Sequence, residues 1–506
     1  MPRSFLSVHH LTFKYSSAVD PVIDDFSCQF ETGWTGIVGA NGCGKTTLLK
    51  LIAGELEPDS GQLCLPSRVI YCEQRTDHLP ASFHELMEDY SKEAFRIRDD
   101  LGIREEWGER WNTLSHGERK RIQLASALFQ QPDILAVDEP TNHLDQPTRR
   151  MLLNALRTYR GIGLLVSHDR EFLDTLSTHT LFMRHGEVLY RKGNYSAIHA
   201  DLLQEEAFKA QQVINVKKKM KKLQVEIAQR KHKAAQADHK KSKKHLSRKD
   251  HDAKLKMDLA RLSGKDAVEG QIKKRLDTQL NRLKESGKSI GWKKPPPSGI
   301  RIESGNPSSQ SFLFHLSPFK IPLGERILCA PYLFLKRGER IGLIGPNGAG
   351  KSILFHYLIE HIGIQKEEIL MIPQEVDEYA TRQLVEEIRT ESKERLAMLM
   401  ALISRLGSQP EGILESPILS PGEMRKLMLA RGILNQPKLI LMDEPTNHMD
   451  LPSIQFVENA LDGCNCAMIL ISHDMRFLSN LNVDFWRIET AESGVNRLNL
   501  SLTKPS

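Results

Sequence analysis

The octapeptide DEPTNHLD occupies residues 138–145, and a near copy, DEPTNHMD, occupies residues 443–450. Each copy follows a short apolar run and precedes a second apolar run that ends in Ser-His-Asp. An acidic peptide that recurs in the same local setting indicates a duplicated unit, so other parts of the chain should repeat at the same offset.

Three further peptide pairs repeat at an offset of 305 or 306 residues. They are GANGCGKT and GPNGAGKS (39–46 and 345–352), LSHGE and LSPGE (114–118 and 419–423), and VSHD and ISHD (166–169 and 471–474). Four motifs in one order at nearly one offset predict two homologous domains, residues 1–196 and 300–506, with a distinct segment at 197–299.

Both predicted domains have the pattern of an α/β fold. Short apolar runs lead into each glycine-rich peptide, each acidic octapeptide and each Ser-His-Asp, and stretches of mixed polarity separate them. Continuous short apolar runs are typical of strands buried in a parallel sheet. Polar residues at the carboxyl ends of such strands border the ligand cleft of an open α/β sheet. We therefore expect two tandem α/β domains with one ligand site each.

The segment between the domains has a helical pattern. A first coiled-coil seam has apolar residues alternately three and four apart, namely Val213, Val216, Met220, Leu223 and Ile227. A second apolar stripe follows at Ile272, Leu276, Leu280 and Leu283. The sequence therefore predicts an α-helical hairpin linker whose tip lies within 240–266. The three prolines at 295–297 should stop its second helix.

Charge is distributed unevenly along the chain. Residues 211–290 contain 24 Lys or Arg and 9 Asp or Glu, a net charge of +15, whereas the whole chain carries +6. A basic excess confined to one segment favours a docking surface for a polyanion. The alternative, a solvated coiled-coil face, is a weaker interpretation because its charges would be better balanced.

Length and composition exclude several classes of protein. The chain has 506 residues and 40% apolar content, which indicates a globular protein of at least two domains. Apolar runs long enough to span a bilayer are absent, as is a signal-peptide core at the N-terminus. The seven cysteines form no C-x-x-C pair, so neither zinc nor an iron–sulfur cluster is expected. These features predict a cytoplasmic protein that needs no membrane.

The glycine-rich peptides match the phosphate-binding pattern G-x-x-x-x-G-K-[ST]. In such a loop the backbone amides surround the phosphates, the lysine neutralises charge and the hydroxyl serves Mg²⁺. The predicted ATP ligands of site one are Gly39, Asn41, Gly42, Gly44, Lys45, Thr46 and Thr47, and those of site two are Gly345, Asn347, Gly348, Gly350, Lys351 and Ser352.

The motifs after the phosphate loops supply the remaining chemistry. Asp138 and Asp443 end apolar strands and should hold Mg²⁺ with the loop hydroxyls, and Glu139 and Glu444 are placed to orient or deprotonate water. His168 and His473 are expected at the γ-phosphate. Gln74 and Gln374 follow the loops where a glutamine that senses metal and γ-phosphate is expected. An isolated acid or histidine would ordinarily be a solvated side chain, but here the order repeats.

This set of motifs resembles the ATP-binding-cassette superfamily over both domains. The resemblance implies that the signature serine and glycine of one domain complete the ATP site of the other, through Ser420 and Gly422 at site one and Ser115 and Gly117 at site two. Such a helix N-terminus suits a γ-phosphate. It also implies a monomer whose two domains dimerise within one chain and both hydrolyse ATP. Tyr15, 24 residues before the first loop, is a candidate to stack on adenine, and Phe319 is a weaker one.

Asn-His within the octapeptides resembles the ABC-F family of translation factors, as does the order cassette, charged helical linker, cassette. This resemblance implies binding to the ribosome at the tRNA exit site, with the linker directed toward the P-site tRNA and the peptidyl-transferase centre. Ribosomal RNA is a polyanion, so the basic segment fits this partner independently. The resemblance implies no obligate protein partner.

Two subtypes of that family, and one other class of protein, stay open. Gln74 and Leu114 are 40 residues apart, against 45 between Gln374 and Leu419, so the first domain has no room for the extra arm of housekeeping members. This spacing favours the ribosome-protection subtype that confers antibiotic resistance, with a housekeeping factor as the alternative. The motor subunit of a membrane transporter is the alternative from another class.

Cys43 replaces the usual small residue in the first phosphate loop, where the second has Ala349. Proximity to a helix N-terminus and to Lys45 favours the thiolate and predicts a lowered pKa and a reactive thiol. The alternative is a small packed side chain.

Overall fold

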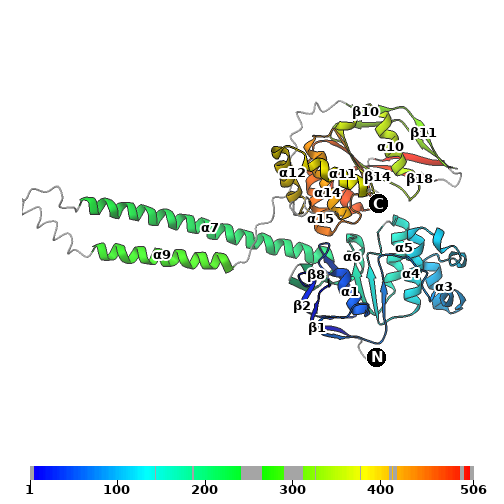
Figure 1. Ribbon diagram of the computed structural model, residues 1–506, viewed down its shortest axis with the longest axis horizontal. Helices are drawn as coiled ribbons and strands as arrows, with labels where there is room; N and C mark the ends of the chain where they lie inside the picture. The colour runs from blue at the N-terminus through cyan, green and yellow to red at the C-terminus, as the bar shows by residue number, and fades with distance from the viewer. Residues whose placement is uncertain are drawn as a thin grey trace, which may run out of the picture. The chain divides into compact units, whose positions relative to one another are not determined.

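The computed structural model describes most of the chain. The described residues are 5–16, 18–142, 144–184, 187–240, 265–289, 312–324, 326–375, 378–408, 413, 419–490 and 495–501. The chain forms two compact units, one made by Met1–Ile198 with Pro296–Ser506 and the other by His199–Pro295, and each is described by itself. The first unit contains the two α/β domains, called the first and the second domain below (Figure 1).

The first domain is built on a six-stranded sheet. Its strand order is β5-β6-β7-β3-β8-β9, parallel except for the last pair. The strands are β3 (Gly33–Gly39), β5 (Val69–Cys72), β6 (Ile134–Asp138), β7 (Ile162–Val166), β8 (Ser177–Arg184) and β9 (Glu187–Lys192). A separate antiparallel sheet of order β2-β1-β4 contains β1 (Leu6–Phe13), β2 (Ile23–Phe30) and β4 (Ser60–Cys64).

The second domain repeats the central parallel strands in the same order. Its eight-stranded sheet runs β11-β12-β19-β18-β14-β17-β16-β15, so β15-β16-β17-β14-β18 corresponds to β5-β6-β7-β3-β8. The strands are β11 (Phe319–Leu323), β12 (Arg326–Ala330), β14 (Arg340–Ile344), β15 (Ile369–Ile372), β16 (Leu439–Asp443), β17 (Ala467–Ile471), β18 (Asp484–Thr490) and β19 (Val495–Ser501). A pair of β10 (Phe312–Leu316) and β13 (Leu333–Lys336) lies apart from it.

Helices pack around these sheets in both domains. In the first domain they are α1 (Lys45–Ala53), α2 (Phe83–Glu88), α3 (Lys92–Asp100), α4 (His116–Phe129), α5 (Gln146–Arg157) and α6 (Arg170–Leu176). In the second they are α10 (Lys351–His361), α11 (Glu378–Arg389), α12 (Lys393–Arg405), α14 (Pro421–Leu434), α15 (Leu451–Asp462) and α16 (Met475–Asn480). The predicted α/β fold class, with two tandem domains of matching topology, is confirmed.

Strand burial explains why the functional motifs meet at one edge of each sheet. Every residue of β6, β7, β16 and β17 is buried, as expected for apolar strands covered by helices on both faces. Asp138 and Asp443 are the last residues of β6 and β16, and each Ser-His-Asp follows β7 or β17. The phosphate loops leave the neighbouring strands β3 and β14 at the same edge, which brings the predicted residues of each site together.

The second unit contains most of a long helix, α7 (Tyr195–Lys240), and a second helix, α9 (Lys265–Ser289), which are drawn in green in Figure 1. Val213 and Ile227 are buried, and the other predicted seam residues of both helices are half-buried. The lysines at 217–219, 221 and 222 between them are exposed. Most of the predicted tip and the prolines at 295–297 lie outside the described residues.

Candidate nucleotide sites

Each phosphate loop ends in a residue with a left-handed backbone, a conformation that glycine adopts readily and other residues rarely do. Gly44 and Gly350 cap α1 and α10 with φ of 97° and 99°. A Cβ on Gly350 would lie 2.7 Å from Leu323 Cδ1, so both the backbone and the space require glycine. Gly42 and Gly348, with φ of 78° and 74°, turn the loop before them.

The two loop lysines adopt the same position. Lys45 Nζ donates to the carbonyls of Gly39 and Ala40, both at 2.9 Å. Lys351 Nζ donates to the carbonyls of Gly345 at 2.7 Å and Pro346 at 3.0 Å. Both lysines are buried. Each therefore places a positive charge inside the loop, where a phosphate would be surrounded by backbone amides.

The predicted metal ligands pair in both sites. Thr46 Oγ1 donates to Asp138 Oδ2 at 2.7 Å, and Ser352 Oγ donates to Asp443 Oδ2 at 2.5 Å. The other carboxylate oxygen of Asp138, Oδ1, is buried without a hydrogen-bond partner. Hydroxyl and carboxylate oxygens are the donors that Mg²⁺ prefers, with water and phosphate completing its shell. The residues therefore fit Mg²⁺, although the described residues contain no cluster of three or more His, Cys, Asp or Glu that could hold a metal unaided.

The two glutamines differ. Gln374 lines the cavity of site two together with Ser352 and Asp443. Gln74 is exposed and, within the described part of the first domain, makes no hydrogen bond to Thr46 or Asp138. Instead Tyr71 donates to Asp138 Oδ2 at 3.2 Å. The structure thus brings one of the two predicted glutamines to its metal site.

Both predicted catalytic glutamates have a strained backbone. Glu139 and Glu444 have φ of 43° and 47°, a region that side-chain-bearing residues rarely adopt. Their amides donate to the carbonyls of Val166 and Ile471, both at 2.9 Å, and so hold them to the neighbouring strand. Such strain persists where the surroundings fix it, commonly at functional sites. The sequence contained no signal for this conformation.

Burial raises the pKa of both glutamates. The pKa of Glu139 rises to about 8, since burial and the Asp138 charge together outweigh Lys45. The pKa of Glu444 rises to about 7, because burial outweighs the positive charges of Arg149 and Lys351. A carboxylate whose pKa lies near neutrality suits a general base that accepts a proton from water.

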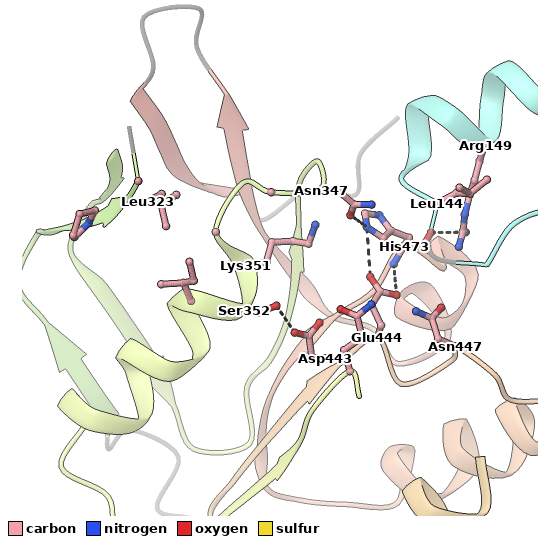
Figure 2. A pocket seen from close by; sticks show the side chains of 16 residues that line it. Leu144, Arg149, Leu323, Asn347, Lys351, Ser352, Asp443, Glu444, Asn447 and His473 are labelled. Carbon is pink, nitrogen blue, oxygen red and sulfur yellow. Dashed lines mark hydrogen bonds and ion pairs between the residues drawn. The ribbon is translucent and has the colours of Figure 1, made fainter. Parts of the chain in front are cut away.

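The two histidines lie against these glutamates and are neutral. His168 Nε2 is 3.1 Å from Glu139 Oε1, and His473 Nε2 is 3.5 Å from Glu444 Oε1. Burial, reinforced by the adjacent loop lysine, lowers the pKa of each histidine to about 3. In site two, His473 Nε2 also lies 3.2 Å from Asn347 Oδ1, as Figure 2 shows. A neutral imidazole can donate one hydrogen bond and accept another at the phosphate end of the site.

Site two surrounds a cavity of about 500 Å³ (Figure 2). The second domain contributes Lys351, Ser352, Asp443, Glu444 and His473 among others, and the first domain contributes Leu144 and Arg149. The first domain's signature residues, Ser115 and Gly117, are not among the lining residues. The structure therefore does not bring this signature to the cavity, and the expected role of Ser115 and Gly117 stays a prediction.

Both signature serines are engaged within their own helices. Ser115 Oγ donates to Glu118 Oε2 at 2.7 Å and accepts from the Glu118 amide at 3.3 Å. Ser420 makes the same reciprocal pair with Glu423, at 2.9 and 3.3 Å. These are capping boxes that fix the first turns of α4 and α14. Gly422 lies close to the carbonyl oxygen of His448. A Cβ added to Gly422 would be only 3.2 Å from that oxygen, so the position favours glycine.

Two residues of the second domain, His448 and Asp450, contact the first phosphate loop, and neither was assigned a role from the sequence. The amide of Asn41 donates to Asp450 Oδ2 at 2.7 Å, and its side chain donates to the His448 carbonyl at 3.3 Å. Asp450 is the last residue of the second acidic octapeptide. The repeat of that octapeptide was the available signal, because both copies end in an aspartate at the same position.

Two buried cations on the signature helices were also missed. Lys120 Nζ donates to the Glu73 carbonyl at 2.6 Å, next to Gln74. Arg425, 305 residues later, donates to the carbonyls of Gln374 and Asn447. Each cation ties its signature helix to the glutamine segment of the same domain. Burial lowers the pKa of Lys120 to about 8.

The two adenine-stacking candidates have different surroundings. Tyr15 is 39% exposed, and its hydroxyl lies 3.1 Å from Thr47 Oγ1 beside the first phosphate loop. Phe319 stacks on Tyr357 with ring centroids 4.3 Å apart and packs against the core of the second domain. Tyr15 therefore keeps a surface for a base, whereas Phe319 has a packing role.

The prediction of a reactive Cys43 is wrong. Its side chain is 5% exposed and belongs to the core of the first domain. Burial raises the pKa of the thiol, and this effect outweighs the charge of Lys45 and the backbone hydrogen bonds that lower it. Desolvation penalises the thiolate more than the nearby positive charge favours it. Cys43 is a small packed residue, the alternative that the sequence left open.

Comparison with known proteins gives matches over both domains. The family model described as "ABC transporter" matches residues 23–142 and 332–447. The chain is 29% identical to "Ribosome protection protein VmlR" of Bacillus subtilis (strain 168), over 88% of this chain and 79% of that protein. It is 26% identical to "Probable ATP-binding protein YbiT" of Escherichia coli O157:H7, over 93% of this chain and 94% of that protein.

Solved structures show the same fold at lower identity. The crystal structure of the complex of archaeal ribosomal stalk protein aP1 and archaeal ribosome recycling factor aABCE1 matches 97% of this chain and 89% of the other with a TM-score of 0.61 and 18% identity. A structure described as RNase-L Inhibitor matches with a TM-score of 0.59 and 18% identity, over 98% of this chain and 90% of that one. At this identity the likeness concerns the fold.

Proposed function

Because this chain belongs to the ABC family, with two cassettes and the resemblance to ABC-F proteins confirmed, we propose that it hydrolyses ATP to bind and leave the ribosome. In this proposal the ATP-bound, closed form binds, and hydrolysis releases it. The carrying observation is the combination of two nucleotide sites, each with its loop lysine, hydroxyl–aspartate pair, glutamate and histidine, and a segment of net charge +15 at residues 211–290 between them.

The hydrolytic part rests on the same residue set in both sites. When bound, Mg²⁺ would neutralise phosphate charge beside Asp138 with Thr46, and beside Asp443 with Ser352. Lys45 and Lys351 add positive charge to the loops. Glu139 and Glu444 would accept the proton of the attacking water, and His168 and His473 would orient the γ-phosphate. Since neither site lacks a member of this set, both should turn over.

The ribosomal part rests on the surface of α7. Lys217, Lys218, Lys219, Lys221 and Lys222 are exposed, and in the described part of this unit none forms an ion pair. Unpaired lysines along one helix can contact phosphates, the dominant mode of binding to RNA. The relative VmlR, named a ribosome protection protein, agrees with such a partner.

We further propose that the protein enters the tRNA exit site, directs its hairpin toward the P-site tRNA and the peptidyl-transferase centre, and protects the ribosome against antibiotics. The name of VmlR supports protection. Between Gln74 and Leu114 the first domain forms only α2, α3 and two short 3₁₀ turns, without a long inserted arm. A housekeeping translation factor is the alternative within this family.

The transporter-motor alternative has less support. The helices described here include none with the length and apolarity to cross a membrane. A motor subunit would obtain its membrane part from a partner, but the lysines of α7 would then have no ligand. Sedimentation with ribosomes or with membranes separates these two functions.

The test replaces Glu139 and Glu444 together by Gln, which should retain ATP binding and stop hydrolysis. The variant should accumulate on 70S ribosomes in ATP and inhibit translation in vitro, while wild type dissociates. Equal release of variant and wild type would contradict the ribosome cycle.

Protection is tested separately. A sensitive bacterium that expresses wild type should tolerate higher doses of at least one peptidyl-transferase or exit-tunnel antibiotic than one expressing the double Gln variant. Unchanged susceptibility across both drug groups would favour the housekeeping alternative.

A further inference from the structure

Arg149 is a cation of the first domain that lines the cavity of the second site. It lies on α5, four residues after the acidic octapeptide, and borders the same 500 Å³ cavity as Lys351, Glu444 and His473. Figure 2 draws it across the cavity from Lys351, beside His473. Arg149 was not among the site residues predicted from the sequence, and the roles assigned to those residues do not involve it.

The contacts of Arg149 leave part of its guanidinium unused. Nη1 donates to the His473 carbonyl at 3.3 Å and lies 3.2 Å from Asp169 Oδ2. The Nε atom is buried without a hydrogen-bond partner. The side chain is 17% exposed, so its charge is largely removed from water. A guanidinium held at one nitrogen, with other donors unused, is suited to bind an oxyanion.

The matching position of the other domain holds no arginine. At the offset of 305 residues that relates the two acidic octapeptides, Arg149 corresponds to Ile454, which is buried on α15. An acid reaches both sites from the opposite domain: Asp450 accepts from the Asn41 amide at site one, and at site two the charge of the matching Asp145 opposes the burial that lowers the pKa of Lys351. Arg149 is the added charge at site two. The residues supplied across the interface therefore differ in charge between the two sites.

We propose that Arg149 binds the phosphate end of ATP at site two from the opposite domain, and that the two sites consequently differ in nucleotide affinity. Its bond to the His473 carbonyl positions the loop that presents His473, and its Nη2, which is not among the buried atoms and makes no hydrogen bond within the described residues, is the donor left for a phosphate. Site one has isoleucine at the matching position and depends on its own Lys45. This inference rests on the proposed nucleotide chemistry, but it concerns binding and does not require hydrolysis.

The test measures binding of a fluorescent ATP analogue, with Mg²⁺, to the full chain with one site silenced. Lys45→Ala leaves site two and Lys351→Ala leaves site one. Arg149→Ile, which copies the residue of the matching position, should weaken binding about tenfold to a hundredfold in the Lys45→Ala protein, as expected for loss of charged hydrogen bonds. It should change affinity by less than about twofold in the Lys351→Ala protein, because site one does not use this residue.

Two further variants separate phosphate binding from a structural role. Arg149→Lys, which keeps the charge but offers one nitrogen in place of three, should recover part of the affinity that Arg149→Ile loses. Arg150→Ile, the same change at the exposed neighbouring position, should leave both affinities unchanged. Equal weakening at both sites, or no weakening at site two, would overturn the inference. Failure of the wild type to hydrolyse ATP would instead remove the proposed function and leave this binding result intact.

Discussion

Arg170 and Glu458 form an ion pair between the two domains. Arg170 Nη1 donates to Glu458 Oε1 at 2.8 Å, with side chains 6% and 11% exposed. Burial raises the pKa of Glu458 even though Arg170 opposes the rise. The positions 305 residues away carry Leu153 and Met475 instead. The chain thus offers its own apolar replacements, Arg170→Met and Glu458→Leu.

Arg170→Met should destabilise the protein because it leaves Glu458 buried without its partner. Breaking a buried pair costs about 3–5 kcal/mol. The carboxyl can escape by protonation, and for a group with an ordinary pKa of 4.5 this costs about 3.4 kcal/mol at pH 7. The penalty should therefore lie near ~3 kcal/mol and fall by about 1.4 kcal/mol per pH unit on acidification.

The sign follows from proton binding. In Arg170→Met the folded-state pKa of Glu458 is raised above its unfolded value, so the folded protein binds more protons between the two values. The free energy of unfolding of Arg170→Met therefore falls as pH rises. The difference in this free energy between wild type and Arg170→Met should shrink as the pH is lowered from about 7.5 to about 5.5. The double variant removes both charges and should recover most of the stability at both pH values.

The assay is a thermal-unfolding double-mutant cycle at both pH values, with small-angle scattering to detect opening of the domains. Each single variant should lose stability or open, and the double variant should approach wild type. Additive losses in the double variant, or a pH-independent deficit in Arg170→Met, would refute the reasoning.

Three further predictions concern the linker, the first loop and the signature helix. Replacing Lys217, Lys218 and Lys221 by Gln should reduce the salt dependence of ribosome binding by about one logarithmic unit for each of these lysines that binds a phosphate, and leave the ATPase rate of the free protein unchanged; an unaltered slope would mean solvated lysines. A maleimide should leave Cys43 unlabelled in the folded protein, with or without ATP, while labelling exposed Cys64 within minutes, as mass spectrometry can check. Lys120→Met should lower the ATPase rate several-fold by releasing α4 from Glu73, with circular dichroism unchanged; full activity would make Lys120 a packing residue.

Motifs made of contiguous residues were predictable from the sequence. A phosphate loop is built almost wholly by its own eight residues, so Lys45 and Lys351 adopt equivalent positions in two different settings. That the central strands of the two domains share one order was also to be expected from the duplication, because the same apolar runs precede the same motifs in both domains. Asp138 with Thr46, and Asp443 with Ser352, meet because neighbouring parallel strands end at one edge.

Features that depend on the balance of burial and charge were not predictable. For Cys43 the sequence shows Lys45 and a helix N-terminus, which favour a thiolate, but not the surrounding core, which disfavours it more. The left-handed backbone of Glu139 and Glu444 depends on a hydrogen bond to the adjacent strand and has no local sequence signal. The role of Gln74 was predicted only from its place in the sequence after the phosphate loop. Its side chain is exposed, and its place in the sequence does not determine where an exposed side chain points.

Contacts between the domains were the least predictable, because they join residues 288 to 409 positions apart. They are also where the two halves differ: Arg149 corresponds to Ile454, and Arg170 with Glu458 to Met475 with Leu153. A duplicated chain can vary such positions independently, which two identical subunits cannot do. The loop lysine, the metal-site aspartate, the glutamate and the histidine of each site match between the halves, whereas Arg149, Arg170 and Glu458 at the interface do not. The two proposed ATP sites can therefore use the same set of residues and still differ in nucleotide affinity, which the Arg149 variants measure directly.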